Sequence, residues 1–263
     1  PYEGDASFLQ GPTERTKAVW NHCLKALEEE RNNNGIRALD YTTVSTITSH
    51  PAGYIDKENE LIVGLQTDQV LKRAIKPFGG INVVMKACRE NGVEVDDRVK
   101  DIFTHYRKTH NDGVFDVYTE EIRSFRSLGF LTGLPDNYAR GRIIGDYRRL
   151  ALYGLDRLIE AKKEDLHNLT GPMTEARIRL REEVAEQIKA LKEIKVLGEY
   201  YGLDLSRPAY TAQEAVQWVY MAYLAAVKEQ DGAAMSLGNV SSFLDIYLEY
   251  ELSQGTITET FAQ

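Results

Sequence analysis

The sequence predicts a mostly helical fold with a few short strands, gathered in a single domain over residues 1–263. Apolar residues recur at helical spacing through most of the second half of the chain, from Asp146 to Leu252. β-branched residues, by contrast, gather in one short run at Tyr41–Ile47. The chain also carries no internal repeat or low-complexity stretch, which argues against a solenoid or a disordered tail.

Short elements are expected in the first half of the chain. Apolar spacing from Val19 to Leu27 predicts a helix that begins after Thr13 and stops before Gly35. The run Tyr41–Ile47 predicts a strand or extended segment, which ends in a turn. Further helices are predicted at Glu60–Ile75, Val84–Glu90 and Val99–Tyr106.

The glycine-rich stretch Thr109–Gly145 is predicted to be loop-rich, and irregular stretches inside a domain are often functional. Helices are predicted after it at Asp146–Ala161, Thr174–Tyr200, Thr211–Glu229 and Phe243–Leu252. The Thr211–Glu229 helix is apolar nearly all round, so we expect it to be buried between other elements.

Charge and cysteine content exclude several classes of protein. A net charge of -8 and a pI near 5.3 argue against nucleic-acid binding, which needs a concentrated basic surface. Cys23 and Cys88 form no zinc or disulfide pattern, which fits a reducing compartment and the cytoplasm. No apolar run approaches the roughly 20 residues that span a bilayer. Pro1 and Thr258–Gln263 look like cuts in a longer polypeptide.

The segment Gly133–Gly145 is the sharpest candidate site. Arg140 and Arg142 flank a glycine, and an arginine grips a carboxylate or phosphate with a planar fork. The functional hypothesis is therefore an anion clamp. The alternative is a surface loop whose arginines pair with Asp136 and Asp146.

Two other features are weaker candidates. The small residues of Asp231–Gly238 allow close approach of a ligand, or simply tight packing at a helix end. Basic residues around Arg123 and Arg126, near Phe115, suit an anion such as a nucleotide, or a solvated face. The five histidines show no ligand spacing, so we expect no metal site.

Blocks spread along the whole chain resemble the pyruvate formate-lyase family. The blocks are Pro1–Asp5 (PYEGD), Ser45–His50 (STITSH), Pro77–Ile81 (PFGGI), Tyr106–Tyr118 (YRKTHNDGVFDVY), Leu131–Arg149 (LTGLPDNYARGRIIGDYRR) and Asp231–Ser236 (DGAAMS). Many long blocks make this resemblance more specific than any one short pattern.

The resemblance implies a glycyl-radical enzyme that converts pyruvate and coenzyme A to acetyl-CoA and formate under anaerobic conditions. It implies an α/β barrel of about ten strands, of which this chain is the N-terminal part, in a homodimer served by a radical-SAM activating enzyme. The family's adjacent cysteine pair and its C-terminal RVSGY radical loop do not occur in this sequence. Cys23 and Cys88 therefore receive no catalytic role, and we expect no lyase activity from this chain alone.

The resemblance also assigns binding residues. Arg142 matches the arginine that binds the pyruvate carboxylate, and Ala233 and Ala234 match residues that line the pyruvate pocket. Phe115 and Arg126 match positions that contact the coenzyme A nucleotide.

Ile188 departs from the family pattern, because it replaces a histidine that stacks on adenine. Coenzyme A binding is thus the least certain of these expectations. Two alternatives stay open: a related enzyme acting on another 2-oxo acid such as 2-ketobutyrate, and a non-catalytic module that docks onto another chain. A nucleic-acid role for Arg140–Arg149 is a weaker rival.

Overall fold

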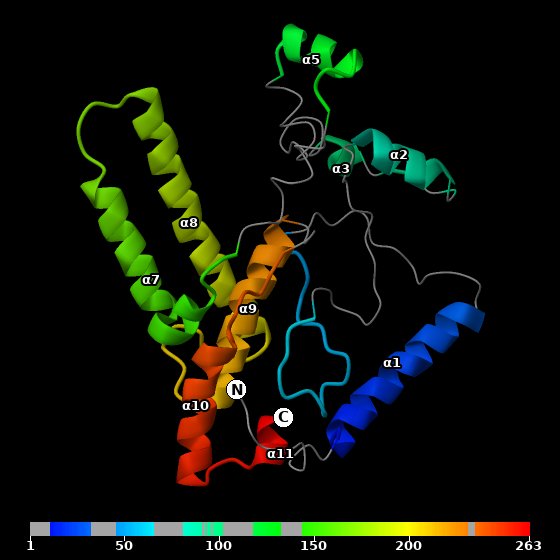
Figure 1. Cartoon of the computed structure of the whole chain (residues 1–263), viewed down its shortest axis with the longest axis vertical. Coiled ribbons are helices and arrows are strands. Elements are labelled where there is room, and N and C mark those ends of the chain that lie inside the picture. Colours follow the sequence, from blue (N-terminus) through cyan, green and yellow to red (C-terminus); the bar gives the residue numbers. More distant parts are fainter. Residues whose placement is uncertain are drawn as a thin grey trace.

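The computed structural model describes residues 11–32, 46–65, 81–90, 92, 94–95, 97–101, 118–132, 144–230 and 235–263, and no strand occurs within those ranges. The helices there are α1 (Glu14–Asn32), α2 (Ile81–Glu90), α3 (Asp97–Asp101), α5 (Glu120–Ser127), α7 (Arg148–Asn168), α8 (Glu175–Tyr200), α9 (Ala212–Gln230), α10 (Ser241–Gln254) and α11 (Glu259–Ala262), shown in Figure 1.

The core lies where four helices meet. α7 and α8 run as an antiparallel pair, α9 packs against both, and α10 packs on α9 (Figure 1). The largest fully buried side chains here are Leu155, Leu197, Leu205, Val219, Met221 and Leu224. Each fully buried side chain of this size stabilises the fold by about 1.5–3 kcal/mol, so these contacts are the main source of stability.

Capping residues fix the turn between α7 and α8. The hydroxyl of Thr174 accepts a hydrogen bond from the Arg177 backbone N–H at 3.4 Å, which caps the start of α8. The Arg181 side chain donates to the carbonyl oxygens of Leu166 and Leu169, at 3.1 and 2.9 Å. Leu169 is the C-cap residue of α7, so these bonds help to satisfy carbonyl groups at the end of the helix.

A backbone crossing bends α7 at Gly154. This glycine has φ 69° and ψ 164°, and a Cβ built on it would lie 2.5 Å from the Arg207 carbonyl carbon and from the Ser206 oxygen. Three backbone hydrogen bonds join the segments that cross: Leu155 N–H to Leu205 O (2.9 Å), Asp156 N–H to Ser206 O (3.2 Å) and Ala209 N–H to Ala151 O (2.8 Å). Only a residue without a side chain lets the two backbones approach this closely.

Arg207 and α9 hold this crossing in place. The Trp218 indole N–H donates to the Arg207 carbonyl at 3.0 Å. The Arg207 guanidinium lies over the rings of Tyr210 and Trp218 and pairs with Glu214 at 2.6 Å. Hydrogen bonding to Arg207 lowers the pKa of the Glu214 carboxyl.

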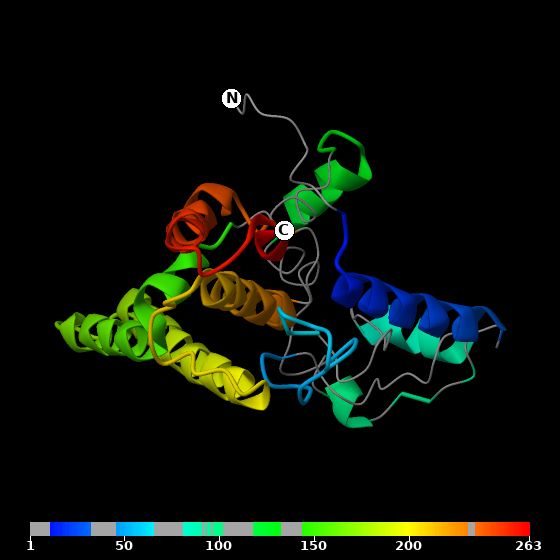
Figure 2. The same cartoon turned by 90° about the horizontal axis from the view of Figure 1, so that it is seen from below.

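Segment 46–65 lies between α9 and α1 (Figures 1 and 2), and side chains bond several of its backbone groups. The Gln217 amide accepts from Val63 N–H and donates to Val63 O, both at 2.7 Å. Tyr220 donates to Gly64 O at 3.0 Å. Tyr201 accepts from Gly53 N–H and donates to Leu65 O, both at 3.0 Å. The segment is thus packed against the core without regular secondary structure.

Most predicted helices are confirmed, since α1, α2 and α7 to α10 form where apolar spacing placed them. The apolar stripe of α1 is present, yet Trp20, Leu24 and Leu27 are 65, 47 and 46% exposed. Trp218 of α9, in contrast, is 2% exposed, as the apolar character of that helix predicted.

Other local predictions need correction. The helix predicted at Glu60–Ile75 does not start at 60, because Leu61, Val63 and Gly64 are hydrogen-bonded to α9 side chains and Gly64 has φ 132°. The stretch predicted to be loop-rich contains a helix that was not predicted, α5, which is capped by Thr119, whose hydroxyl accepts from Ile122 N–H at 3.2 Å. Thr46 and Ile47 lead into a turn, and the rest of the predicted strand, residues 41–45, lies outside the described residues.

Because of the crossing, we expect that adding a single methyl group at Gly154 strongly lowers the stability of the protein. Gly154→Ala should destabilise the protein by roughly 4 kcal/mol, because it combines a left-handed φ with a clash against backbone atoms. Urea unfolding, followed by circular dichroism, measures this change.

Gly202→Ala is the matched control, because Gly202 has a similar φ of 70° and no atom within 4 Å of a built Cβ. It should cost about 1 kcal/mol, for the backbone conformation alone. Equal losses in the two variants would contradict the role assigned to the crossing.

Lys228, in the last turn of α9, predicts a dependence of stability on pH. Its side chain is 4% exposed, and burial lowers the pKa of the ammonium from 10.5 to about 8. Between these values the unfolded chain holds the proton more strongly, so Lys228 makes its full destabilising contribution below about pH 8 and loses it as the pH rises towards about 10.5.

Comparison with Lys228→Met isolates this contribution, because the titrations shared by both proteins cancel. The free energy of unfolding of the wild type should rise relative to that of the variant by about 3 kcal/mol over this interval. Denaturant titrations at a series of pH values test the prediction. A difference that does not change with pH would contradict it.

Candidate functional site

The two segments predicted to line a pocket meet in the structure at their described flanks. One flank is residues 144–147, which lead into α7, and the other is residues 235–238, which follow α9. Gly238 lies against Ile144, because a Cβ built on Gly238 would be 2.9 Å from the Ile144 Cγ2 atom. Segments about 90 residues apart in sequence therefore lie side by side here.

Two tyrosines join these flanks more specifically. The rings of Tyr147 and Tyr223 pack edge to face, with centroids 5.4 Å apart and an interplanar angle of 86°. The Tyr223 hydroxyl donates to the Met235 carbonyl at 3.3 Å. Gly145 allows this packing, since a Cβ there would lie 2.8 Å from the Tyr147 ring. We call Tyr147, Tyr223 and the Met235 carbonyl the tyrosine bridge.

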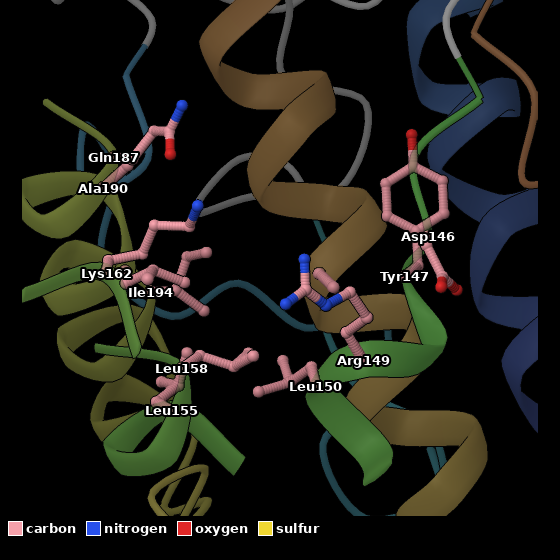
Figure 3. Close-up of a pocket in the computed structure, with 12 residues that line it drawn as sticks. Asp146, Tyr147, Arg149, Leu150, Leu155, Leu158, Lys162, Gln187, Ala190 and Ile194 are labelled. Carbon is pink, nitrogen blue, oxygen red and sulfur yellow. The ribbon is translucent and has the colours of Figure 1, made fainter. Parts of the chain in front are cut away.

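A cavity of about 320 Å³ lies beside the bridge, between α7, α8 and α9 (Figure 3). Apolar side chains make most of its wall, namely Leu150, Leu155, Leu158, Leu191, Ile194, Ala190 and Ala222. Its polar lining consists of Asp146, Tyr147, Arg149, Lys162 and Gln187. The volume suits a small molecule rather than a chain segment.

Two of the charged side chains that line the cavity, Asp146 and Lys162, form ion pairs. Arg148 donates to Asp146 at 2.7 Å, and this hydrogen bond lowers the pKa of the Asp146 carboxyl. Lys162 pairs with Asp165 at 2.8 Å. In Figure 3 the Arg149 side chain points towards α9, and Arg149 forms no ion pair within the described part of the chain. The arrangement can hold a molecule with an anionic end and an apolar body.

The predicted site residues are only partly within the described ranges. Arg142, Ala233, Ala234 and Phe115 lie outside the described residues. Arg126 is in the last turn of α5, half-buried, with its guanidinium 5.5 Å from the Tyr118 ring centroid. The structure thus brings together the neighbours of Arg142 and Ala234, while these residues themselves stay predictions.

The fit to coenzyme A is incomplete at α8. Ile188 is 9% exposed and packs in the core cluster that also contains Val184 and Leu197. A side chain in that position presents little surface for an adenine ring. The absence of the family's histidine and the burial of its replacement therefore both weaken the nucleotide half of the coenzyme A prediction.

Sequence reasoning placed the two bridging tyrosines only within the predicted helices Asp146–Ala161 and Thr211–Glu229. Their role at the site depends on contacts between distant segments, which periodicity does not report. One local signal was available, since Tyr147 follows Gly145 by two residues and a glycine there makes room for a folded-back ring.

The described residues contain neither a candidate membrane span nor a candidate metal site. None of the helices within those ranges combines the length and apolar character that crossing a membrane requires. Nor do three His, Cys, Asp or Glu side chains in the same ranges gather closely enough to hold a metal ion.

Comparisons with known proteins cover the whole chain. A family model described as pyruvate formate lyase-like matches residues 1–263. The formate acetyltransferase of Haemophilus influenzae is 55% identical over 268 residues, which take in 100% of this chain and 35% of that protein. The chain therefore spans about a third of the length of this curated relative.

Solved structures match at lower identity. The glycerol-bound B12-independent glycerol dehydratase of Clostridium butyricum matches with a TM-score of 0.62 and 17% identity, over 96% of this chain and 38% of that one. A glycyl radical enzyme from Archaeoglobus fulgidus matches with a TM-score of 0.52 and 15% identity, over 97% and 37%. Identities this low show a shared fold alone.

Proposed function

Because the chain belongs to the pyruvate formate lyase-like family, we propose that it forms part of a formate C-acetyltransferase, which converts pyruvate and coenzyme A to acetyl-CoA and formate. The observation that carries this proposal is 55% identity to a formate acetyltransferase along the entire chain. The relative is almost three times as long, so the reaction also draws on residues that this sequence does not contain.

The contribution of this chain is to bind and orient pyruvate. Arg142 grips the carboxylate with its planar fork, and Ala233 and Ala234 form a wall small enough for a three-carbon acid. The tyrosine bridge supports this assignment. Arg142 precedes Ile144 by two residues and Ala234 directly precedes Met235, and these two neighbours belong to the flanks that meet.

The wider features of the enzyme belong to the same proposal. The chain supplies a single domain, the N-terminal part of a ten-stranded α/β barrel in a homodimer that a radical-SAM enzyme activates. Phe115 and Arg126 contact the coenzyme A nucleotide, as the matching positions of the family imply. The setting is anaerobic glucose metabolism in the cytoplasm. The glycyl radical and the cysteine pair lie outside this sequence, which contains neither motif.

Calorimetric titration of pyruvate tests the pocket directly. The chain should bind pyruvate, and Arg142→Ala should weaken binding at least tenfold, because a paired guanidinium–carboxylate contact is lost. Arg140→Ala is the matched control and should bind like the wild type. A folded chain that releases no heat with pyruvate would contradict a pocket formed within these residues.

An activity assay tests whether this chain alone catalyses the reaction. The purified chain, incubated without oxygen with pyruvate, coenzyme A and the activating enzyme, should release no formate. The physical reason is that radical transfer needs a thiol pair and a radical glycine that this sequence lacks. Formate above the level of a blank without protein would overturn this expectation.

A further inference from the structure

The cavity between α7, α8 and α9 lies in the helical core and is lined mainly by aliphatic side chains (Figure 3). Leu150 and Leu155, which border it, are 3 and 0% exposed, so this part of its wall is shielded from bulk water. Protein interiors are normally packed as densely as organic crystals, and a space of about 320 Å³ leaves the wall without part of its contacts. A ligand with an apolar body would restore those contacts.

The volume of the cavity sets the size of that body. An apolar cavity of about 150 Å³ in a protein core holds one benzene molecule. The cavity between the three helices is about twice as large, so it has room for a chain of roughly eight to ten carbon atoms and a small polar group. This size excludes a peptide segment and favours a small molecule.

The charges at the cavity favour an anionic group on that molecule. Asp146 and Lys162 already form ion pairs with residues outside the cavity lining. The Gln187 amide donates to the Glu183 carboxylate at 3.2 Å. Arg149 forms no ion pair within the described ranges, and its side chain points towards α9, which contributes Ala222 to the wall (Figure 3). A guanidinium in this state can bind a carboxylate through two parallel hydrogen bonds.

We propose that this cavity is a binding site for a small carboxylic acid with an apolar chain. The carboxylate pairs with Arg149, and the chain lies among the aliphatic side chains of α7, α8 and α9. The site does not depend on the proposed function, because pyruvate has no apolar chain long enough to fill the space. Charge complementarity with the guanidinium selects the acid over an alcohol of the same length.

Calorimetric titration of the purified chain with octanoate tests the site, and octan-1-ol is the matched neutral ligand. Octanoate should bind at least tenfold more tightly than octan-1-ol, because only the acid forms charge-assisted hydrogen bonds with Arg149. A folded chain that does not bind octanoate, or that binds both compounds equally, would overturn the proposal.

Two charge variants test the role of Arg149. Arg149→Gln should weaken octanoate binding at least tenfold and leave octan-1-ol binding unchanged. Arg157→Gln is the matched control, because Arg157 is also in α7, pairs with Glu164 at 3.6 Å and does not line the cavity. Octanoate affinity that is unchanged in Arg149→Gln, or that falls equally in the two variants, would overturn the assignment of the carboxylate to Arg149.

A filled cavity tests the location of the apolar chain. Ala190 is half-buried on α8 and lines the cavity, so Ala190→Leu should occupy part of the space and abolish the binding of both compounds. Thermal unfolding followed by circular dichroism checks that the variant is folded. A folded Ala190→Leu chain that binds octanoate like the wild type would overturn this location. If the variant does not fold, the comparison of Arg149→Gln with Arg157→Gln decides.

Competition separates this site from the proposed function. Neither pyruvate nor coenzyme A should displace octanoate from the wild-type chain. Displacement by either would overturn a separate site, since the cavity would then belong to the substrate pocket. A chain that binds octanoate and not pyruvate would contradict the proposed pyruvate pocket alone.

Discussion

The close approach of residues 205–209 to Gly154 is the constraint on which the rest of the structure depends. This crossing bends α7, and its backbone hydrogen bonds tie the link between α8 and α9 to the first half of α7. Trp218 and Arg207 then fix the start of α9 against the same point. The relative placement of α7, α8 and α9 follows, and with it the cavity that they enclose.

Polar side chains of α9 hold two other parts of the chain against the core. On one side Gln217 and Tyr220 complete the backbone hydrogen bonds of segment 46–65, which has no regular structure of its own. On another side Tyr223 reaches both flanks of the candidate pocket. The few polar side chains of this largely apolar helix thus form hydrogen bonds to the backbone of neighbouring segments. These bonds replace the ones that the backbone groups lose to water on burial.

The sequence predicted the parts of the fold that periodicity controls. The helices of the core and the burial of α9 follow from apolar spacing, and the family follows from long matching blocks. Periodicity did not reveal the extended course of residues 61–65 or the bend at Gly154, because both depend on backbone contacts between distant segments. At the site, the match to the family identified Arg142, Ala233 and Ala234 as candidates. Only the structure showed that Tyr223 contacts both Tyr147 and Met235, which lie near them in sequence.

The positions of the two tryptophans have a spectroscopic consequence. Trp218 is almost fully buried at the Gly154 crossing, and Trp20 stands exposed on the apolar stripe of α1. The indole of Trp218 therefore emits at shorter wavelength and resists quenching by iodide, whereas that of Trp20 emits near the wavelength of tryptophan in water and is readily quenched. The intrinsic fluorescence of this chain accordingly contains two separable signals. That of Trp218 reports on the helical core, and that of Trp20 reports whether another surface covers α1.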